Sequence, residues 1–323
     1  MARVPSHESQ PPGVPPVQPA RTPGSFLRPL VVSLRPAQWT KNLVVFAALI
    51  FGERLTDTPS VVRALGAFVI FCGLSGTVYL VNDVLDREAD RLHPVKSRRP
   101  VASGALSTRA ALSAAFALGL VALAASWLLG GAFLVVAGSY LGLLSVYSGP
   151  IKHVVILDVL TIAIGFVLRA AAGAVAIGVP ISQWLLVCTI LLALFLALSK
   201  RRHELVLLAG GAKHHRRILG EYSPYLLDQM IAVVTASTLM GYALYTVSPD
   251  TVAHFGTDRL LLTLPFPIYG IFRYLYLVHQ KQGGGSPAEM LLTDRPLLVC
   301  VALWALSVGV IIYGPRAGTA LVR

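Results

Sequence analysis

The chain has 323 residues, of which 55% are hydrophobic and only 13% are charged, and its formal net charge is +12. An average soluble domain has about 25% charged residues, so this composition excludes an ordinary soluble protein and favours one embedded in a membrane. The basic residues fall in short loops between apolar segments. We therefore expect them to orient the chain in a membrane or to bind phosphate, with no nucleic-acid partner.

Residues 1–25 form a polar, proline-rich tail without the apolar core of a signal peptide. Such a segment cannot bury enough apolar surface to fold, so we expect a disordered tail followed by one domain over residues 26–323. Apolar segments in that domain predict an all-α polytopic protein with about nine transmembrane helices. The segments are 43–51, 62–81, 110–129, 132–147, 154–177, 184–198, 230–247, 260–278 and 297–313. The first is short, and residues 31–34 would extend it.

Most of the 27 lysine and arginine residues fall in loops that would share the side of the N-terminus. Short cytoplasmic loops are enriched in these residues, so the bias predicts a cytoplasmic N-terminus and an external C-terminus. With that orientation, the polar chemistry of the chain gathers at the cytoplasmic ends of the helices.

Three aspartates follow segment 62–81. Asp83, Asp86 and Asp90 are spaced to share one face of a continuing helix, next to Asn82. Carboxylates crowded beside a bilayer repel one another, and a divalent cation would relieve that repulsion. Mg²⁺ prefers carboxylate oxygen and is usually shared with substrate phosphates. On spacing alone, a solvated acidic helix end that pairs with neighbouring arginines is an equally good interpretation.

Basic residues recur on the same predicted side of the membrane. A loop bounded by prolines follows the aspartates and contains Arg98 and Arg99, which would bind phosphate oxygens or form a plain cytoplasmic loop. Further cations lie near the ends of other segments, and these are Lys41, Lys152, Lys200, Arg201 and Arg202. The cluster after segment 184–198 would also complement a helix dipole and an anionic leaflet without any ligand.

Segment 154–177 carries two charged residues, Asp158 and Arg169. At this separation they lie on nearly the same helix face, with Arg169 about 16 Å deeper in the membrane. An arginine at that depth needs a partner or a polar cavity. A structural ion pair or a carbonyl contact would satisfy it, and so would a ligand such as a lipid phosphate. Gly165, one turn earlier, would leave room for the guanidinium.

The run from Asn82 to Asp90 matches an NDxxDxxxD signature, and the chain from about residue 34 onward resembles the UbiA-type intramembrane prenyltransferase superfamily. That resemblance implies nine helices around a central cavity open to the cytoplasmic side, with Mg²⁺ between two aspartate motifs. This chain lacks the second acidic motif and has Lys152 and Asp158 at the matching place. Together with segments 35–42, 93–100, 165–173 and 199–204, that departure resembles the decaprenyl-phosphate phosphoribosyltransferase branch.

The branch implies transfer of phosphoribosyl from 5-phosphoribosyl diphosphate to a polyprenyl phosphate at a bacterial plasma membrane, for a cell-wall polysaccharide precursor. We expect Mg²⁺ on Asn82, Asp83, Asp86 and Asp90, and catalytic roles for Asp83, Asp86, Lys152 and Asp158. We expect substrate contacts from Lys41, Asn82, Arg98, Arg99, Tyr147, Arg169, Lys200, Arg201 and Arg202. Asp158 would bind ribose hydroxyls or a metal-bound water, and Arg169 would orient the lipid phosphate. A lipid phosphate is already an anion, so no general base is required.

Two rival functions predict different features. A prenyltransferase that uses a prenyl diphosphate to alkylate an aromatic or other acceptor would carry a second carboxylate cluster near Asp158. A transporter would show short, Gly- or Pro-broken spans in paired halves, and no convincing internal repeat is visible. The sequence does not decide the length of the lipid, nor between a monomer and a homo-oligomer.

Overall fold

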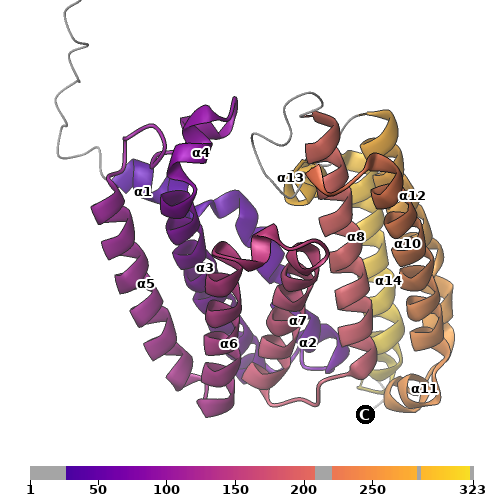
Figure 1. The fold of residues 1–323 in the computed structure, drawn as a ribbon. Helices are drawn as coiled ribbons and strands as arrows, with labels where there is room; N and C mark the ends of the chain where they lie inside the picture. The colour runs from indigo at the N-terminus through magenta and orange to yellow at the C-terminus, as the bar shows by residue number, and fades with distance from the viewer. Residues whose placement is uncertain (1–26, 208–219, 282–284, 321–323) are drawn as a thin grey trace, which may run out of the picture.

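The computed structural model describes residues 27–207, 220–281 and 285–320, and within these ranges every regular element is a helix. Figure 1 shows two groups of helices, with α1 to α7 in one group and α8 to α14 in the other. Helix α7 packs against both α6 and α8, so it lies at the boundary between the two groups. The tail predicted over residues 1–25 lies outside the described residues.

Eight stretches in the described part of the chain are long and apolar enough to cross a membrane. They are α3 (Thr58–Leu85), α5 (Thr108–Leu128), α6 (Gly131–Ser148), α7 (Leu157–Ile177), α8 (Gln183–Leu207), α10 (Pro224–Val247), the stretch Arg259–Gln280 and Arg295–Gly314. The stretch Arg259–Gln280 joins the 3-10 helix η6 (Arg259–Thr263) to α12 (Pro265–Gln280), and Arg295–Gly314 lies within α14 (Arg295–Ala320). All eight coincide with predicted segments, which confirms an integral membrane protein of the all-α polytopic class.

The segment predicted as the first span forms several short helices instead of one long helix. These are α1 (Leu27–Leu34), the 3-10 helix η2 (Pro36–Phe46) and α2 (Ala47–Phe51). Helix α1 ends because Arg35, with φ of 53°, precedes Pro36, and a residue before proline is disfavoured in the right-handed helical region. The predicted count of about nine therefore corresponds to eight continuous stretches and this broken segment.

Close packing holds the broken segment against α7. A Cβ on Gly173 would lie only 2.0 Å from the carbonyl oxygen of Val45 in η2, so the approach requires glycine. Val45 also belongs to a buried apolar cluster with Phe71, Phe133 and Tyr140, which come from α3 and α6. The broken segment is thus part of the core of the first helix group.

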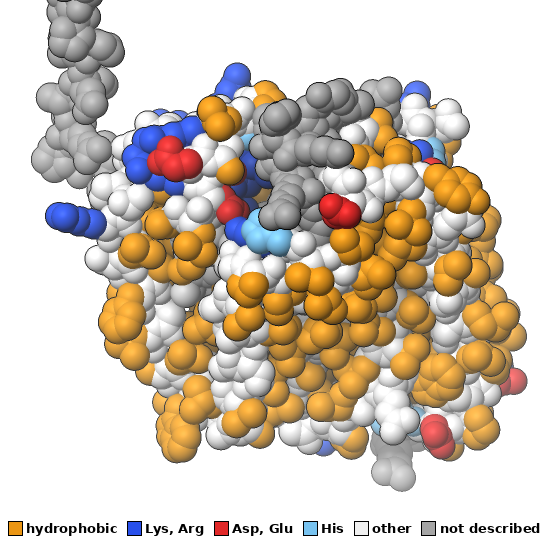
Figure 2. Space-filling model, viewed as in Figure 1, with side chains coloured by type: hydrophobic (Ala, Val, Ile, Leu, Met, Phe, Trp, Pro, Cys, Tyr) orange, Lys and Arg blue, Asp and Glu red, His pale blue; other side chains and the backbone are white. Residues whose placement is uncertain are grey.

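The short elements mark the two ends of the molecule. Helices α1, α4 (Arg87–Leu92) and α13 (Pro287–Thr293) lie at one end, and α11 (Pro249–Phe255) lies at the other (Figure 1). Figure 2 shows lysine and arginine side chains gathered near α4, above a broad hydrophobic surface. We call the end that contains α1, α4 and α13 the basic end.

Candidate active site

The three aspartates lie where α3 ends at the basic end. Helix α3 stops at Leu85, and Asp86, with φ of −91° and ψ of 5°, separates it from α4. The expectation that one continuous helix would present all three carboxylates on one face is therefore wrong. Asp83 and Asp90 are buried, whereas the side chain of Asp86 is 38% exposed and pairs with a different cation. The carboxylates of Asp83 and Asp90 therefore lie close together, and the bend at Asp86 separates the third carboxylate from them.

Arginines from two other parts of the chain neutralise the buried carboxylates. Nη1 of Arg99 lies 3.2 Å from Oδ1 of Asp83 and 2.6 Å from Oδ2 of Asp90. Arg35, which precedes η2, also donates a hydrogen bond to Oδ1 of Asp83. Because Asp83 and Asp90 are both buried, the alternative of a solvated acidic helix end is wrong for these two residues.

The carboxylates fit a divalent cation. A single nitrogen of Arg99 contacts both Asp83 and Asp90, so one positive centre can reach both side chains. Oδ2 of Asp83 is buried and has no hydrogen-bond partner among the described residues. Mg²⁺ usually takes one or two protein carboxylates and completes its shell with water and phosphate oxygen.

The four predicted metal ligands do not converge on one point. Within the described residues, no three His, Cys, Asp or Glu side chains form a ready-made metal cluster. Asn82 is half-buried, and Asp86 is paired with Lys152. A magnesium ion here would depend on substrate phosphates for much of its coordination, and the predicted ligand set stays a prediction.

Lys152 lies beside the aspartates because of the loop that joins α6 to α7. It belongs to a 3-10 turn, η4 (Ile151–His153), and its Nζ is 2.5 Å from Oδ1 of Asp86. The lysine side chain is only 13% exposed, whereas that of Asp86 is 38% exposed, so water reaches this ion pair from the side of the carboxylate. The structure therefore places Lys152 beside Asp86, and its role toward a substrate stays a prediction.

Arg169 is buried in α7 and held by neutral acceptors. Its Nε donates to Oδ1 of Asn42 at 2.7 Å, its Nη1 to the carbonyl oxygen of Gly165 at 3.0 Å, and its Nη2 to the hydroxyl of Tyr140 at 2.5 Å. Its guanidinium carbon also lies 4.6 Å from the centre of the Tyr140 ring. The carbonyl contact was one of the two structural alternatives, and no carboxylate among the described residues pairs with Arg169.

Gly165 does not provide the clearance that we expected. A Cβ at this position would lie 3.6 Å from Nη1 of Arg169, which is an ordinary contact. What Gly165 supplies is its backbone carbonyl. Lys41 is half-buried and lies close enough to Arg169 to feel its positive charge, so two cations occur together deep in this helix group.

Asp158 is paired with Arg201, although the helix spacing had grouped it with Arg169. Oδ2 of Asp158 accepts from Nε of Arg201 at 2.7 Å, and Oδ1 accepts from the hydroxyl of Tyr222 at 2.8 Å. Arg201 also donates to Glu204 at 2.5 Å and to the hydroxyl of Tyr147 at 3.3 Å. Both charges are buried, and each carboxylate oxygen of Asp158 has a partner within the protein.

The other predicted cations lie in different surroundings. Arg202 pairs with Asp228 of α10, at the interface between α8 and α10. Lys200 lies 3.7 Å from Glu204, and Arg98 is exposed on the 3-10 turn η3 (Lys96–Arg98). The structure thus brings Lys152 and Arg99 to the aspartates, and it places Arg202 in a separate ion pair.

Two residues beside the site were not predicted individually. Arg35 opened a motif used for the family resemblance, but a single arginine before an apolar segment also fits the rule for cytoplasmic loops. Tyr222 contacts Asp158 from 64 residues away, and no local pattern in the sequence marks it. Tyr222 precedes α10, and its contact with α7 depends on how α8 packs against both α7 and α10.

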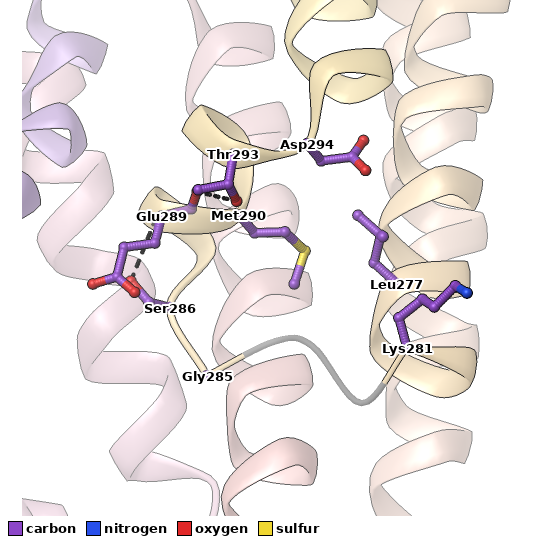
Figure 3. A pocket seen from close by; sticks show the side chains of 8 residues that line it. All are labelled: Leu277, Lys281, Gly285, Ser286, Glu289, Met290, Thr293 and Asp294. Carbon is purple, nitrogen blue, oxygen red and sulfur yellow. Dashed lines mark hydrogen bonds between the residues drawn. The ribbon is translucent and has the colours of Figure 1, made fainter. Parts of the chain in front are cut away.

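A pocket of about 580 Å³ also lies at the basic end, between α12 and α13 (Figure 3). Leu277 of α12 and Lys281, which follows that helix, line one side of it, and Met290 of α13 points toward them (Figure 3). Ser286, at its edge, accepts a hydrogen bond from Gln38 of η2 at 3.3 Å. Of the residues that line it, none belongs to the predicted site. The cavity that the resemblance implies among the aspartates stays a prediction.

Comparisons with known proteins agree with this arrangement. The chain matches the model of the UbiA prenyltransferase family over residues 43–293. It is 34% identical to a decaprenyl-phosphate phosphoribosyltransferase of Corynebacterium glutamicum, over 88% of this chain and 86% of that protein. The Mycolicibacterium smegmatis protein of the same name is 32% identical, over 95% of this chain and 98% of that protein.

A solved structure shares the fold. A UbiA homolog from Archaeoglobus fulgidus, bound to GPP and Mg²⁺, matches with a TM-score of 0.69 and 20% identity, over 88% of this chain and 99% of that chain. At this identity the likeness concerns the arrangement of the helices. It agrees with the all-α membrane architecture described above.

Proposed function

The chain belongs to the UbiA prenyltransferase family, and from that premise we propose that it transfers the 5-phosphoribosyl group from 5-phosphoribosyl diphosphate to a polyprenyl phosphate such as decaprenyl phosphate. Relatives that are 32–34% identical over most of the chain are named decaprenyl-phosphate phosphoribosyltransferases. The observation that carries the proposal is the buried pair Asp83 and Asp90, which Arg35 and Arg99 neutralise, with the ion pair of Asp86 and Lys152 next to it in the chain. Such a set suits a substrate that brings several negative charges.

The proposed reaction exchanges one bond for another. An oxygen of the lipid phosphate attacks C1 of the ribose, a C–O bond forms, and the bond from C1 to the diphosphate breaks. The diphosphate leaves with the electron pair of that bond. Since the attacking phosphate is already an anion, no side chain has to remove a proton. The protein contributes positioning of the two substrates and stabilisation of the charge that develops on the leaving group.

The diphosphate would lie at the basic end of α3. Asp83 and Asp90 would hold Mg²⁺, and the bound ion would supply positive charge to the departing diphosphate. The cations that neutralise these carboxylates would then be shared with the phosphate oxygens. Bidentate recognition of phosphate is a property of arginine, which suits Arg99, and Lys152 acts as a point charge.

The lipid phosphate would lie deeper, toward α7. Arg169 carries a full positive charge that is compensated by hydroxyl, amide and carbonyl oxygens, and no carboxylate among the described residues balances it. A buried charge without a counter-ion is costly, and an anionic ligand would remove that cost. Lys41 would add a second positive charge beside it. This subsite would orient the lipid phosphate toward the ribose.

A labelled-substrate assay tests the proposal. Purified protein in detergent, with Mg²⁺ and decaprenyl phosphate, is given 5-phosphoribosyl diphosphate labelled in the ribose. We expect label in the lipid fraction, and no such transfer by an Asp83→Asn control. If no polyprenyl phosphate accepts label while a prenyl diphosphate is consumed with an aromatic acceptor, the chain is instead a prenyltransferase that alkylates that acceptor. Absence of labelled lipid with every polyprenyl phosphate tried overturns the proposal.

The orientation of the chain follows from the same interpretation. The basic end holds the proposed diphosphate site, and soluble phosphoribosyl diphosphate would be supplied from the cytoplasm. We therefore propose that the basic end faces the cytoplasm in a bacterial plasma membrane, with the product used as a cell-wall polysaccharide precursor. The lysine and arginine residues that gather there support this orientation (Figure 2).

A further inference from the structure

The loop that carries Lys152 is held at both of its ends by one residue from another helix. The loop covers residues 149–156, between α6 and α7. Arg201 of α8 donates to the hydroxyl of Tyr147, in the last turn of α6, and to the carboxylate of Asp158, in the first turn of α7. Its guanidinium therefore joins the two helix ends from which the loop extends.

A second contact fixes the end of this loop. The backbone N–H of Ile156 donates to the hydroxyl of Tyr222 at 2.8 Å, and the same hydroxyl donates to Asp158 at 2.8 Å. Ile156 has φ of 69° and ψ of −44°, which is rare for a β-branched residue and must be maintained by its surroundings. Burial raises the pKa of Tyr222 to about 12, so its hydroxyl keeps the proton that it donates.

These contacts lead to a role for residues that the proposed reaction does not use. We propose that Arg201 and Tyr222, acting through Asp158 and Ile156, are positioning residues that hold the loop so that Lys152 reaches Asp86 and the diphosphate. The part that concerns the diphosphate rests on the proposed function. The part that concerns the loop does not.

Burial argues against direct substrate contact by this group. Arg201 is 2% exposed and Asp158 is fully buried, and both oxygens of Asp158 are already bound. A buried ion pair contributes little to stability compared with apolar side chains of similar size, so stability alone does not explain it. Its geometry does explain it, because the planar guanidinium binds Asp158 through Nε and Tyr147 through Nη2 and so fixes two helix ends in one relative position.

Hydrogen exchange tests the positioning directly. Tyr222→Phe keeps the ring and removes the hydroxyl that binds both Ile156 and Asp158. The matched control is Tyr242→Phe, because the hydroxyl of Tyr242 is also buried and bonded, to Thr263 at 2.6 Å and Trp304 at 2.9 Å, but lies in α10 away from this loop. We expect amide exchange in residues 149–156 to be about tenfold faster in Tyr222→Phe and unchanged in Tyr242→Phe. Equal exchange in the two variants overturns the proposal, whatever the substrate is.

Kinetics with a double-mutant cycle test the link to Lys152. We expect Tyr222→Phe to raise the KM for 5-phosphoribosyl diphosphate about tenfold and to leave the KM for polyprenyl phosphate unchanged. In a Lys152→Met background the same change should have less than about a twofold effect, because the group it positions is gone. If the two substitutions raise this KM by factors that multiply in full in the double variant, Tyr222 acts independently of Lys152, which contradicts the proposal.

A second variant covers a failure of Tyr222→Phe to fold. Arg201→Lys keeps the charge but cannot bind Tyr147 and Asp158 with one planar fork, so the same faster exchange and the same selective rise in KM are expected. Wild-type exchange and kinetics in Arg201→Lys would overturn the proposal. If the wild-type protein does not use 5-phosphoribosyl diphosphate at all, the proposed function fails, and the exchange measurement still decides the positioning.

Discussion

The ammonium of Lys152 lies 2.5 Å from the carboxylate of Asp86, although 66 residues separate them in the chain. This ion pair connects the loop between α6 and α7 to the bend that follows α3. Arg35 and Arg99 approach the neighbouring carboxylate of Asp83 from two further segments. The candidate site is thus assembled from four separate parts of the chain.

Asp83 is expected to be indispensable for turnover. The substitution Asp83→Asn keeps the shape of the side chain but removes the negative charge that Arg35 and Arg99 face. We expect phosphoribosyl transfer to fall by at least about a hundredfold, with the elution profile and melting temperature in detergent close to those of the wild type. Wild-type activity in this variant would contradict the assignment of the metal–diphosphate site.

Removal of divalent cations should stop the reaction. We expect EDTA to abolish transfer and Mg²⁺ to restore it, with Ca²⁺ less effective because it prefers a larger and more flexible shell. A binding measurement separates this from an effect on chemistry alone: Mg²⁺ plus inorganic diphosphate should raise the melting temperature of the wild-type protein but not that of Asp83→Asn. An equal rise in both proteins would place the ion elsewhere.

Arg169 should affect the lipid substrate selectively. In Arg169→Ala, the buried cation proposed to face the lipid phosphate is gone, so we expect the KM for polyprenyl phosphate to rise about tenfold or more. The KM for 5-phosphoribosyl diphosphate should change much less. Arg273→Ala is a suitable control, because Arg273 is paired with Asp294 and is not part of the site. An unchanged KM for the lipid in Arg169→Ala would refute the subsite.

The pair between Arg273 and Asp294 should make stability depend on pH at acidic values. The hydrogen bond from Arg273 holds the pKa of Asp294 below its ordinary value, so its stabilising contribution is complete above the ordinary pKa and disappears as pH falls through the folded-state value. Asp294→Asn retains an acceptor for the backbone N–H of Leu297, but it loses the charge and the second oxygen, which accepts from Nη2 of Arg273.

Thermal melting in detergent measures this contribution. We expect the melting temperature of Asp294→Asn to lie about 1–2 °C below that of the wild type at pH 7, since a partly exposed ion pair contributes little. The difference should begin to shrink as the pH falls below about 4, and it should disappear below the folded-state pKa of Asp294. A difference that stays constant as the pH falls from about 5 to about 2 would show that packing, and not charge, is responsible.

The proposed orientation can be measured with cysteine labelling. Arg98 is exposed at the basic end, and Arg54 is exposed beyond α2. With a maleimide that does not cross membranes, we expect Arg98→Cys to react in inverted vesicles and Arg54→Cys to react in right-side-out vesicles. The unchanged chain, in which Cys72 and Cys300 are buried and Cys188 is half-buried, gives the background. The reverse labelling pattern would mean that the basic end faces outward.

Helix positions were predictable because each one depends on a continuous apolar stretch of bilayer length. Eight predicted segments became eight candidate spans, with ends that moved by up to nine residues, the most at the end of α8. The exception was the segment around residue 36. There the extended apolar pattern suggested one span, but Pro36 and the left-handed Arg35 divide the chain into short helices. The rule that a helix usually ends at or before the residue preceding a proline would have predicted that break.

The sequence by itself determined that this protein lies in a membrane, where its helices run, and which charged residues stand at their ends. Only the tertiary structure decided which partner each charged side chain has. Asp158 and Arg169 share a helix face, yet Asp158 pairs with Arg201 of the next helix and Arg169 bonds to Asn42, 127 residues away. The physical reason is that a buried charge must be satisfied by whatever group the packing brings within hydrogen-bond distance, and spacing along one helix does not contain that information.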